Sequence, residues 1–348
     1  MNTIAELSST DRRDLFTETA ARQGIGSATV IEKDYRVCWT LSRLFSSAQH
    51  RWPDMVFKGR TSLSKAYNAI RRFSEDIDLS LGRGAFGFMD DAAFMSLGTN
   101  KRDAATNELL ARGAALVCGP PADALETDFT TGLRDVQGSW ALRRPDGADR
   151  NRAQTLTFEY PRSLEAGSYG PDAYIRPAVL LEFGVRADTW PAEWRPVVPY
   201  AAEAFPDLFP TARATVSALS IVRTFWEKAT ILHAEHYRDA AKALPERLSR
   251  HYYDLAVLAA GPFGDRALAD ADLRAAVVEH KALFFSSGWA RYDLAVPGTF
   301  QLLPSEGHAR SLERDYHRTR EMLFDDAPLW ADIIGALRTV EHQINRVE

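Results

Sequence analysis

The segment from residue 178 to residue 185, AVLLEFGV, restricts the fold more than any other part of the chain. It is almost continuously apolar, which is typical of a central strand of a sheet. Further strands are predicted at residues 54–57, 76–81 and 155–160, and residues 76–81, DIDLSL, alternate polar and apolar side chains. Because residues 10–48 have a helical pattern, the chain is expected to combine a sheet with helices.

A proline-rich stretch follows the last predicted strand and is the best candidate for a domain boundary. Its prolines are Pro191, Pro196, Pro199, Pro206 and Pro210. From residue 215 onward the pattern is mainly helical, and 348 residues suffice for two structural units. The sequence therefore predicts an α+β fold, with strands and N-terminal helices in residues 1–205 and a helical domain in residues 206–348.

The net charge of −5 argues against broad, non-specific binding of nucleic acid, although a local basic patch is compatible with it. Arginines do cluster locally, at Arg71, Arg72, Arg143, Arg144, Arg150 and Arg152. The two cysteines are far apart in sequence, so neither a zinc site nor a disulfide framework is expected. The N-terminus has no apolar signal core, and no apolar run approaches the ~18 residues that span a bilayer. We expect a cytoplasmic protein that does not bind membranes.

Asp76 and Asp78 are the first candidates for catalytic residues. On a strand, residues two apart point the same way, so both carboxylates project together while Ile77 packs behind them. Two close negative charges repel each other unless a cation lies between them, and Mg²⁺ favours one or two carboxylates plus substrate phosphates. The alternative is a solvated strand face on which two acids occur by chance.

The residues just upstream favour phosphate chemistry over that alternative. Lys58 and Gly59 lead into a helix that Thr61 or Ser62 can cap. Backbone N–H groups of such a turn can approach phosphates closely, and Lys58 adds positive charge at the same place.

Glu182 is the third candidate acid. It lies in the middle of the apolar strand at residues 178–185, where a buried carboxylate is costly unless it is paired or binds a metal. The alternative is an outward-facing side chain on an edge strand. In the functional interpretation, Asp76, Asp78 and Glu182 form a metal-binding triad on neighbouring strands.

The helical half contains two further candidates, Lys228 and Asp254. Lys228 lies among apolar residues in a predicted helix, and its alternative role is to cover the core with its aliphatic stem. Asp254 lies at helical spacing from Arg247, Arg250 and His251, and the alternative there is an exposed face of ion pairs. The spacing alone does not decide between these interpretations.

Six sequence blocks, taken together, resemble the AbiEii/AbiGii toxin family, whose members are nucleotidyltransferase-like toxins of type IV toxin–antitoxin and phage-defence systems. The blocks are IEKDY (31–35), FKGRTSLSKAY (57–67), RFSEDIDLSL (72–81), VLLEFG (179–184), RTFWEKATILHAEH (223–236) and RHYYDLAVL (250–258). The resemblance implies a polymerase-β-like nucleotidyltransferase core joined to a mainly helical C-terminal domain. It also implies transfer of a nucleotide from an NTP to an RNA, such as the 3′ end of tRNA, and a cognate antitoxin as partner.

The resemblance assigns roles to individual residues. It implies that Asp76, Asp78 and Glu182 bind Mg²⁺, that Lys228 holds the NTP phosphates, and that Ser74 contacts nucleotide or metal. Asp254 matches the acid of the RHxxDL helix. With these roles, the expected phosphate-binding groups are Lys58, Arg60, Lys228 and the segment Gly59, Arg60, Thr61 and Ser62.

Arg60 departs from the family pattern, which usually has glycine or serine at that position. An arginine there either obstructs the close approach of phosphate or binds phosphate itself, and the sequence favours obstruction. An alternative function follows from this departure. The chain would then be a nucleotide-binding module without transfer activity that acts through a protein partner.

Overall fold

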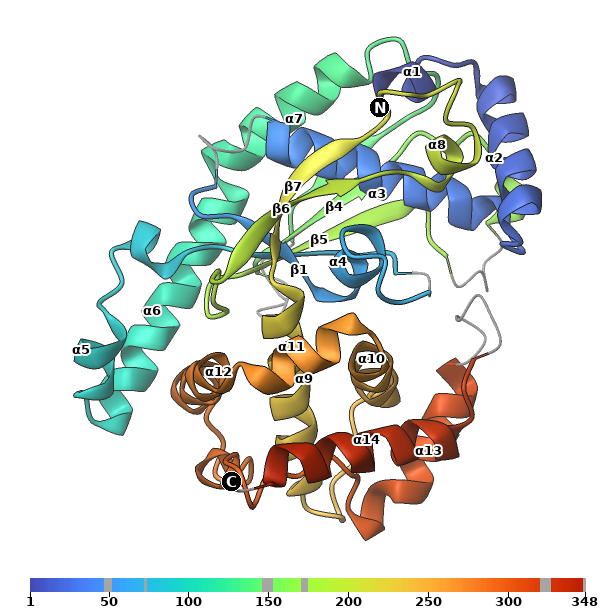
Figure 1. Cartoon of the computed structure of the whole chain (residues 1–348). Helices are drawn as coiled ribbons and strands as arrows, with labels where there is room; N and C mark the ends of the chain where they lie inside the picture. Colours follow the sequence, from blue (N-terminus) through green and yellow to red (C-terminus); the bar gives the residue numbers. More distant parts are fainter. Residues whose placement is uncertain (47–51, 72–73, 146–152, 170–174, 320–326, 347–348) are drawn as a thin grey trace. The chain divides into compact units, whose positions relative to one another are not determined.

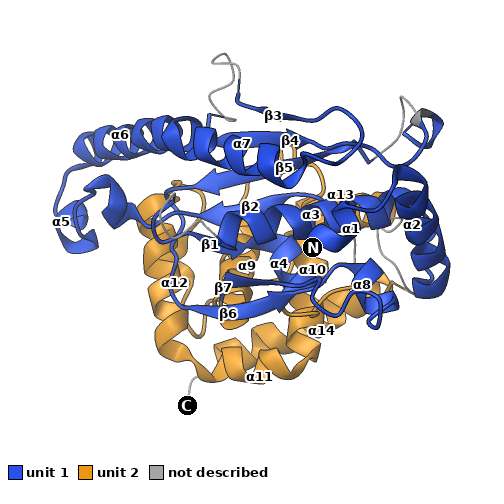
Figure 2. Ribbon diagram, turned by 90° about the horizontal axis from the view of Figure 1, so that it is seen from above, with its two compact units in different colours: residues 1–66, 74–219 blue, residues 67–73, 220–348 orange. Residues whose placement is uncertain are grey.

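The computed structural model describes residues 1–46, 52–71, 74–145, 153–169, 175–319 and 327–346 (Figure 1). The chain forms two compact units (Figure 2). The first unit comprises Met1–Ala66 and Ser74–Leu219, and the second comprises Tyr67–Phe73 and Ser220–Glu348. The expected α+β class is confirmed, since the first unit holds a mixed sheet with helices and the second is helical. Arg72, Arg150 and Arg152 lie outside the described residues.

Within the described residues, the first unit contains a seven-stranded sheet with the order β3-β4-β5-β2-β1-β7-β6. The pairs β1–β7 and β2–β5 are parallel, and the other neighbours are antiparallel. The strands are β1 (Val56–Lys58), β2 (Ile77–Ser80), β3 (Ala141–Arg143), β4 (Thr155–Glu159), β5 (Ala178–Gly184), β6 (Ala192–Val197) and β7 (Ala214–Leu219).

Strand β5 lies between β4 and β2, so its predicted central place in the sheet is confirmed. Its two faces differ, however. Val179, Leu181 and Phe183 are buried, whereas Glu182 on the opposite face is exposed. The apolar run therefore does not place Glu182 in an apolar interior, because the period of two along a strand sends it away from the buried side.

The predicted boundary after residue 205 precedes β7, which the structure places in the sheet of the first unit. The helical pattern expected from residue 215 thus begins only after Leu219. The segment Ala214–Leu219 alternates buried and more exposed residues, as a strand does. The prolines at 191 and 196 mark an edge strand rather than a linker, because β6 is at the end of the sheet, where proline is tolerated.

The helices of the first unit include two that sequence patterns did not place, within residues 82–135. They are α6 and α7, and α6 buries only Leu109, Gly113 and Val117 along its whole length, which explains its weak periodicity. The helices of this unit are α1 (Asn2–Ala5), α2 (Ser9–Gln23), α3 (Ala28–Ser46), α4 (Gly59–Lys65), α5 (Asp91–Met95), α6 (Thr99–Cys118), α7 (Pro120–Gly132) and α8 (Tyr200–Ala204), with short 3₁₀ turns at Arg83–Phe86 and Ala166–Ser168.

Helix α3 packs against β7 and β5 of the sheet and against α2, α7 and α8. An aromatic cluster joins it to α7 and β4, with ring centroids 4.9 Å apart for Trp39 and Phe129 and 5.6 Å apart for Trp39 and Phe158. The apolar stripe expected along this helix is confirmed, because Ile31, Tyr35, Trp39, Leu41 and Leu44 are all fully buried.

Three consecutive charged residues of α3 are also buried, and each contacts a different part of the first unit. The Glu32 carboxylate accepts a hydrogen bond from the Ser163 amide (2.7 Å) and another from the Tyr169 hydroxyl. Lys33 Nζ donates to Glu75 at 2.7 Å and to the Arg176 carbonyl at 3.2 Å.

The third of these residues, Asp34, forms an ion pair with Lys65 at 2.8 Å and accepts a hydrogen bond from the Tyr200 amide at 2.7 Å. Lys65 is the last residue of α4. Through Lys33 and Asp34, α3 therefore fixes both the segment that leads into β2 and the helix that follows β1.

The second unit is built on α9, which packs against α10, α11 and α12, while α10 also packs against α13 and α14. The Trp226 indole of α9 donates to the Ala267 carbonyl at 3.0 Å, which ties α9 to α11. The helices are α9 (Ile221–His236), α10 (Ser249–Ala260), α11 (Pro262–Ala269), α12 (Ala271–Phe284), α13 (Glu306–Thr319) and α14 (Trp330–Asn345), with a 3₁₀ turn at Tyr292–Leu294.

We predict that Lys65→Met strongly destabilises the first unit. Methionine keeps most of the packing of the lysine stem but leaves the buried Asp34 carboxylate without its cation, which costs roughly 3–5 kcal/mol in the free energy of unfolding. Urea unfolding measures this loss. The matched control is Glu18→Gln, which breaks the exposed pair of Arg22 and Glu18 and should change stability by less than about 0.5 kcal/mol. Equal small effects in both variants would contradict the structural role of the buried pair.

Candidate active site

Strand pairing brings Lys58, Asp78 and Glu182 into one row across the sheet. Lys58 pairs with Asp78 between β1 and β2, and Asp78 pairs with Glu182 between β2 and β5. Directly paired residues project their side chains to the same face of a sheet. The row is therefore polar, while the neighbouring residues Phe57, Ile77 and Leu181 point to the opposite face and are fully buried.

The carboxyl groups of this row interact strongly with one another. Burial, repulsion from Asp78 and Asp76, and a side-chain hydrogen bond with Asp78 raise the pKa of Glu182 to about 7, against an opposing effect of Arg60. A hydrogen bond between two carboxyl groups requires a proton on one of them, so the pair holds a shared proton near neutral pH.

Asp76 lies just before β2, two residues from Asp78. Burial is the main cause that raises the pKa of Asp76 to about 6, and repulsion from Glu75 and Asp78 adds to it, while Lys33 and Arg60 act in the opposite direction. Asp76 thus belongs to the same electrostatic cluster as Asp78 and Glu182, which is the grouping of three acids that the sequence predicted.

The turn between β1 and α4 lies directly against Asp78. Gly59 has a φ of 76°, and a Cβ atom built on it would be 2.0 Å from Asp78 Oδ2. Both the backbone conformation and the lack of space therefore require glycine at this position. The close approach places the backbone at the start of α4 beside the carboxylate row.

Thr61 and Ser62 do not cap this helix, contrary to the sequence prediction. The helix begins at Gly59, so both residues lie inside its first turns, and the cap position is Lys58, whose side chain makes no capping bond. The Thr61 hydroxyl donates to the Asp76 carbonyl at 2.5 Å and lies 2.8 Å from Ser74 Oγ. The Ser62 hydroxyl donates to the Gly59 carbonyl at 2.9 Å. These bonds hold α4 against the segment that carries Asp76.

Arg60 follows the glycine turn and lies within helix α4. Its φ is not positive, so the left-handed conformation is confined to Gly59 and the arginine causes no backbone strain. Its positive charge lowers the pKa of both Asp76 and Glu182, which shows that the guanidinium lies near the carboxylate row.

Lys228 and Asp254 belong to the second unit and contact each other. Lys228 Nζ on α9 lies 2.8 Å from Asp254 Oδ2 on α10, and the two residues are 5% and 0% exposed. Lys228 therefore does not extend its ammonium into solvent, and the Asp254 carboxylate does not lie on an exposed helix face. Arg247, expected on the same helical face, precedes α10 with a φ of 60°, and its amide donates to Asp315.

The structure thus brings together most of the residues that the sequence singled out. The first unit holds Lys58, Gly59, Arg60, Thr61, Ser62, Ser74, Asp76, Asp78 and Glu182, whereas Lys228 and Asp254 form a separate pair in the second unit. Sequence reasoning missed the contribution of Lys33 and Glu75. The signal was present, because Lys33 is one of three charges that precede an apolar helical run.

The donor atoms of the row suit a hard divalent cation. The described residues contain no ready-made group of three or more His, Cys, Asp or Glu side chains that could hold a metal ion. Mg²⁺ does not require such a cage, since it commonly uses one or two carboxylates together with water and substrate phosphates. The hydrogen-bonded Asp78 and Glu182, with Asp76 close by, fit that mode of binding.

Comparison with known proteins identifies the family. The sequence model described as "Nucleotidyl transferase AbiEii toxin, Type IV TA system" matches residues 41–339. The chain belongs to this family. The resemblance deduced from the six sequence blocks is therefore confirmed, and the chain is a nucleotidyltransferase toxin of the type IV toxin–antitoxin class.

Two further comparisons add little to that assignment. No protein of curated function matches the chain in sequence. Among solved structures, the chain is similar to MenT4, a nucleotidyltransferase toxin of Mycobacterium tuberculosis, with 15% sequence identity and a TM-score of 0.36. The match covers 87% of this chain and 98% of MenT4. Within the residues that the structure describes, no helix has the length and apolar character needed to cross a membrane.

Gly59→Ala is expected to disrupt the candidate active site. The new Cβ would overlap the Asp78 carboxylate, and the left-handed backbone alone costs a non-glycine residue roughly 1–2 kcal/mol. We expect a lower melting temperature and loss of nucleotide transfer. Gly26→Ala is the matched control, because no atom lies within 4 Å of its Cβ position and its φ is ordinary. A Gly59→Ala variant with normal stability and turnover would show that Asp78 is not held against this turn.

Asp78→Asn is predicted to stabilise the metal-free protein at high pH. The pKa of Glu182 rises from 4.5 to about 7 on folding, so the folded state holds more protons than the unfolded state between these values. Stability therefore falls as the pH rises through this window. Removal of the Asp78 charge reduces the repulsion that contributes to this fall.

In EDTA at about pH 8 the variant should be more stable by on the order of 1 kcal/mol, a value reduced for solvent screening because Glu182 is exposed. The gain should disappear near pH 4, where the acids are protonated in both states. Chemical denaturation over this pH range measures the difference, and a gain that did not vary with pH would contradict the electrostatic origin.

Proposed function

We propose that the chain transfers a nucleoside monophosphate from an NTP to the 3′ end of an RNA, with Mg²⁺ as cofactor. The observation that carries this proposal is the row in which Asp78 and Glu182 share a hydrogen bond while the turn at Gly59 lies against Asp78. Membership of a nucleotidyltransferase toxin family supports the reaction class. A tRNA is the proposed acceptor, because a toxin that modifies its 3′ end would stop translation.

In the proposed mechanism, Asp76, Asp78 and Glu182 hold the cation, which would neutralise the charge that develops on the phosphates. Lys58 and Arg60 bind the β- and γ-phosphates, together with backbone groups from Gly59 to Ser62. The 3′ hydroxyl oxygen of the RNA attacks the α-phosphorus in line, a new P–O bond forms, and the bond to the bridging oxygen breaks. Pyrophosphate leaves, and orientation with charge neutralisation supplies most of the rate.

Two neighbours of the site assist by position alone. The Thr61 hydroxyl holds the Asp76 carbonyl, and Ser74 lies beside Thr61, so both residues keep the acids and the phosphate-binding turn in register. Ser74 is also proposed to contact nucleotide or metal through its hydroxyl, as the family resemblance implies.

Lys228 is proposed to contact the NTP phosphates, again from the family resemblance. Its ammonium is bound to the buried Asp254 carboxylate at 2.8 Å, so a phosphate would have to replace or share that partner. Asp254 in turn keeps the lysine protonated, because a nearby negative charge favours the cationic form. We propose the cytoplasm as the location and a cognate antitoxin as the partner that restrains the toxin.

A second candidate function is nucleotide binding without transfer, through a protein partner. Arg60 favours it, since a guanidinium near Asp76 and Glu182 partly neutralises the carboxylates that would otherwise attract Mg²⁺. The unstrained backbone at Arg60 nevertheless supports a role as phosphate ligand, because the side chain is compatible with the turn as it stands.

A labelled-NTP transfer assay with total RNA tests the proposal and separates the two candidates. We expect Mg²⁺-dependent labelling of RNA by the wild type and none by Asp78→Asn. Arg60→Gly should weaken NTP binding by roughly 1.5–3 kcal/mol if Arg60 is a phosphate ligand. Tighter binding and faster transfer by Arg60→Gly would show that Arg60 obstructs the site. Binding of NTP with no labelling of RNA, in wild type and Arg60→Gly alike, would favour the second candidate.

A further inference from the structure

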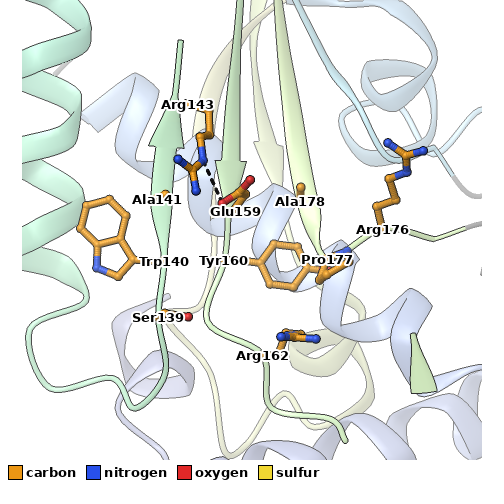
Figure 3. A pocket seen from close by; sticks show the side chains of 10 residues that line it. All are labelled: Ser139, Trp140, Ala141, Arg143, Glu159, Tyr160, Arg162, Arg176, Pro177 and Ala178. Atoms are coloured by element: carbon orange, nitrogen blue, oxygen red, sulfur yellow. Dashed lines mark hydrogen bonds and ion pairs between the residues drawn. The ribbon is translucent and has the colours of Figure 1, made fainter. Parts of the chain in front are cut away.

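A second feature of the first unit is a pocket of about 420 Å³ at the ends of β3, β4 and β5. Three arginines line it. Arg143 comes from β3, Arg162 follows β4, and Arg176 precedes β5 (Figure 3). Because these segments are far apart in sequence and meet only in the sheet, the pocket is a product of the fold rather than of a local basic stretch.

The pocket has an excess of positive charge. Its lining contains these three guanidinium groups and one carboxylate, Glu159, which pairs with Arg143 at 3.1 Å. Arg162 and Arg176 are exposed, and their side chains make no hydrogen bond or ion pair with any other residue that the structure describes. Two uncommitted guanidinium groups in one hollow are unusual in a chain with a net charge of −5 and point to an anionic ligand.

The pocket lies on the same face of the sheet as the carboxylate row. Ala178 lines the pocket and points to the same side as Glu182, because the two residues are separated by an even number of positions along β5. Ala178 pairs with Glu159, which pairs in turn with Ala141, so this row of the pocket runs parallel to that of Asp78 and Glu182. At ~3.3 Å per residue, the two rows are ~13 Å apart.

A buried lysine connects the pocket to the acids. The Lys33 ammonium donates both to the Glu75 carboxylate and to the Arg176 carbonyl. Glu75 is the residue before Asp76, and the Lys33 charge also lowers the pKa of Asp76. One ammonium thus fixes the backbone of a pocket arginine and the start of the acid-bearing strand, so the pocket is held at a constant place beside the candidate active site.

We propose that this pocket binds the phosphodiester backbone of the acceptor RNA, just upstream of the reacting 3′ hydroxyl, with Arg162 and Arg176 as the phosphate ligands. The inference rests on the proposed function. The phosphates of the NTP are assigned to the turn at Lys58 and Arg60, and a distance of ~13 Å from the carboxylate row suits a phosphate more than one nucleotide from the chain end. Contacts of this kind position a strand without reading its sequence.

The test compares two double variants with the same change in charge. Arg162→Gln/Arg176→Gln alters the pocket, and Arg13→Gln/Arg213→Gln alters two exposed arginines that do not line it. Fluorescence anisotropy of labelled tRNA and of a short labelled single-stranded RNA is measured over a range of salt concentrations. Thermal melting confirms that both variants fold, and Arg162→Lys/Arg176→Lys provides a variant that keeps the charge.

For the pocket variant we expect RNA affinity to fall on the order of tenfold or more, and the dependence of log K on log salt to become shallower by roughly 1.4, at ~0.7 for each lost phosphate contact on a single strand. The KM for RNA should rise while the KM for NTP stays unchanged. The control variant should resemble the wild type, and the lysine variant should retain most of the affinity and the salt dependence.

The inference and the proposed function fail in different ways. RNA binding that depends on Arg162 and Arg176, in a wild type that transfers no nucleotide, would support the pocket and refute the proposed transfer. Equal RNA binding by the pocket and control variants would overturn the inference while leaving transfer intact. It would also be overturned if the wild type did not bind RNA, or if the pocket variant changed only the KM for NTP.

Discussion

The buried charges of helix α3 are the constraint on which the rest of the first unit depends. Lys33 and Asp34 are nearly inaccessible to water, so their charges are tolerable only while Glu75 and Lys65 remain in place. These two partners belong to the segments before β2 and at the end of α4. An interaction in the core of the unit thus determines where the carboxylate row and the phosphate-binding turn lie, without contacting either directly.

The sequence predicted the fold class, the central place of β5 and the grouping of the three acids, because each depends on periodicity within a few residues. Alternation in DIDLSL is enough to place Asp76 and Asp78 on one face. The pairing of Asp78 with Glu182 was accessible only as an expectation, since nothing local specifies which strand becomes the neighbour of β2. That choice depends on the whole sheet.

The errors have physical causes of the same kind. The proline-rich stretch resembled a linker, but an edge strand tolerates proline as well as a linker does, and β7 continues the sheet beyond it. Thr61 and Ser62 are good capping residues, yet the left-handed conformation of Gly59 starts the helix earlier and frees both hydroxyls to bond elsewhere. The Lys228–Asp254 pair could not be foreseen, because two helices must dock before those side chains meet.

The parallel pairing of β2 with β5 has a consequence for synthesis of the protein in the cell. Asp78 and Glu182 become neighbours only when the strand that carries Glu182 has emerged from the ribosome and closed a long loop onto β2. Strand β1 likewise acquires its parallel neighbour only with β7, which is later still in the chain. A nascent or prematurely terminated chain therefore carries the aspartates without the glutamate. A ribosome that makes this toxin is protected from it until most of the sheet has been translated.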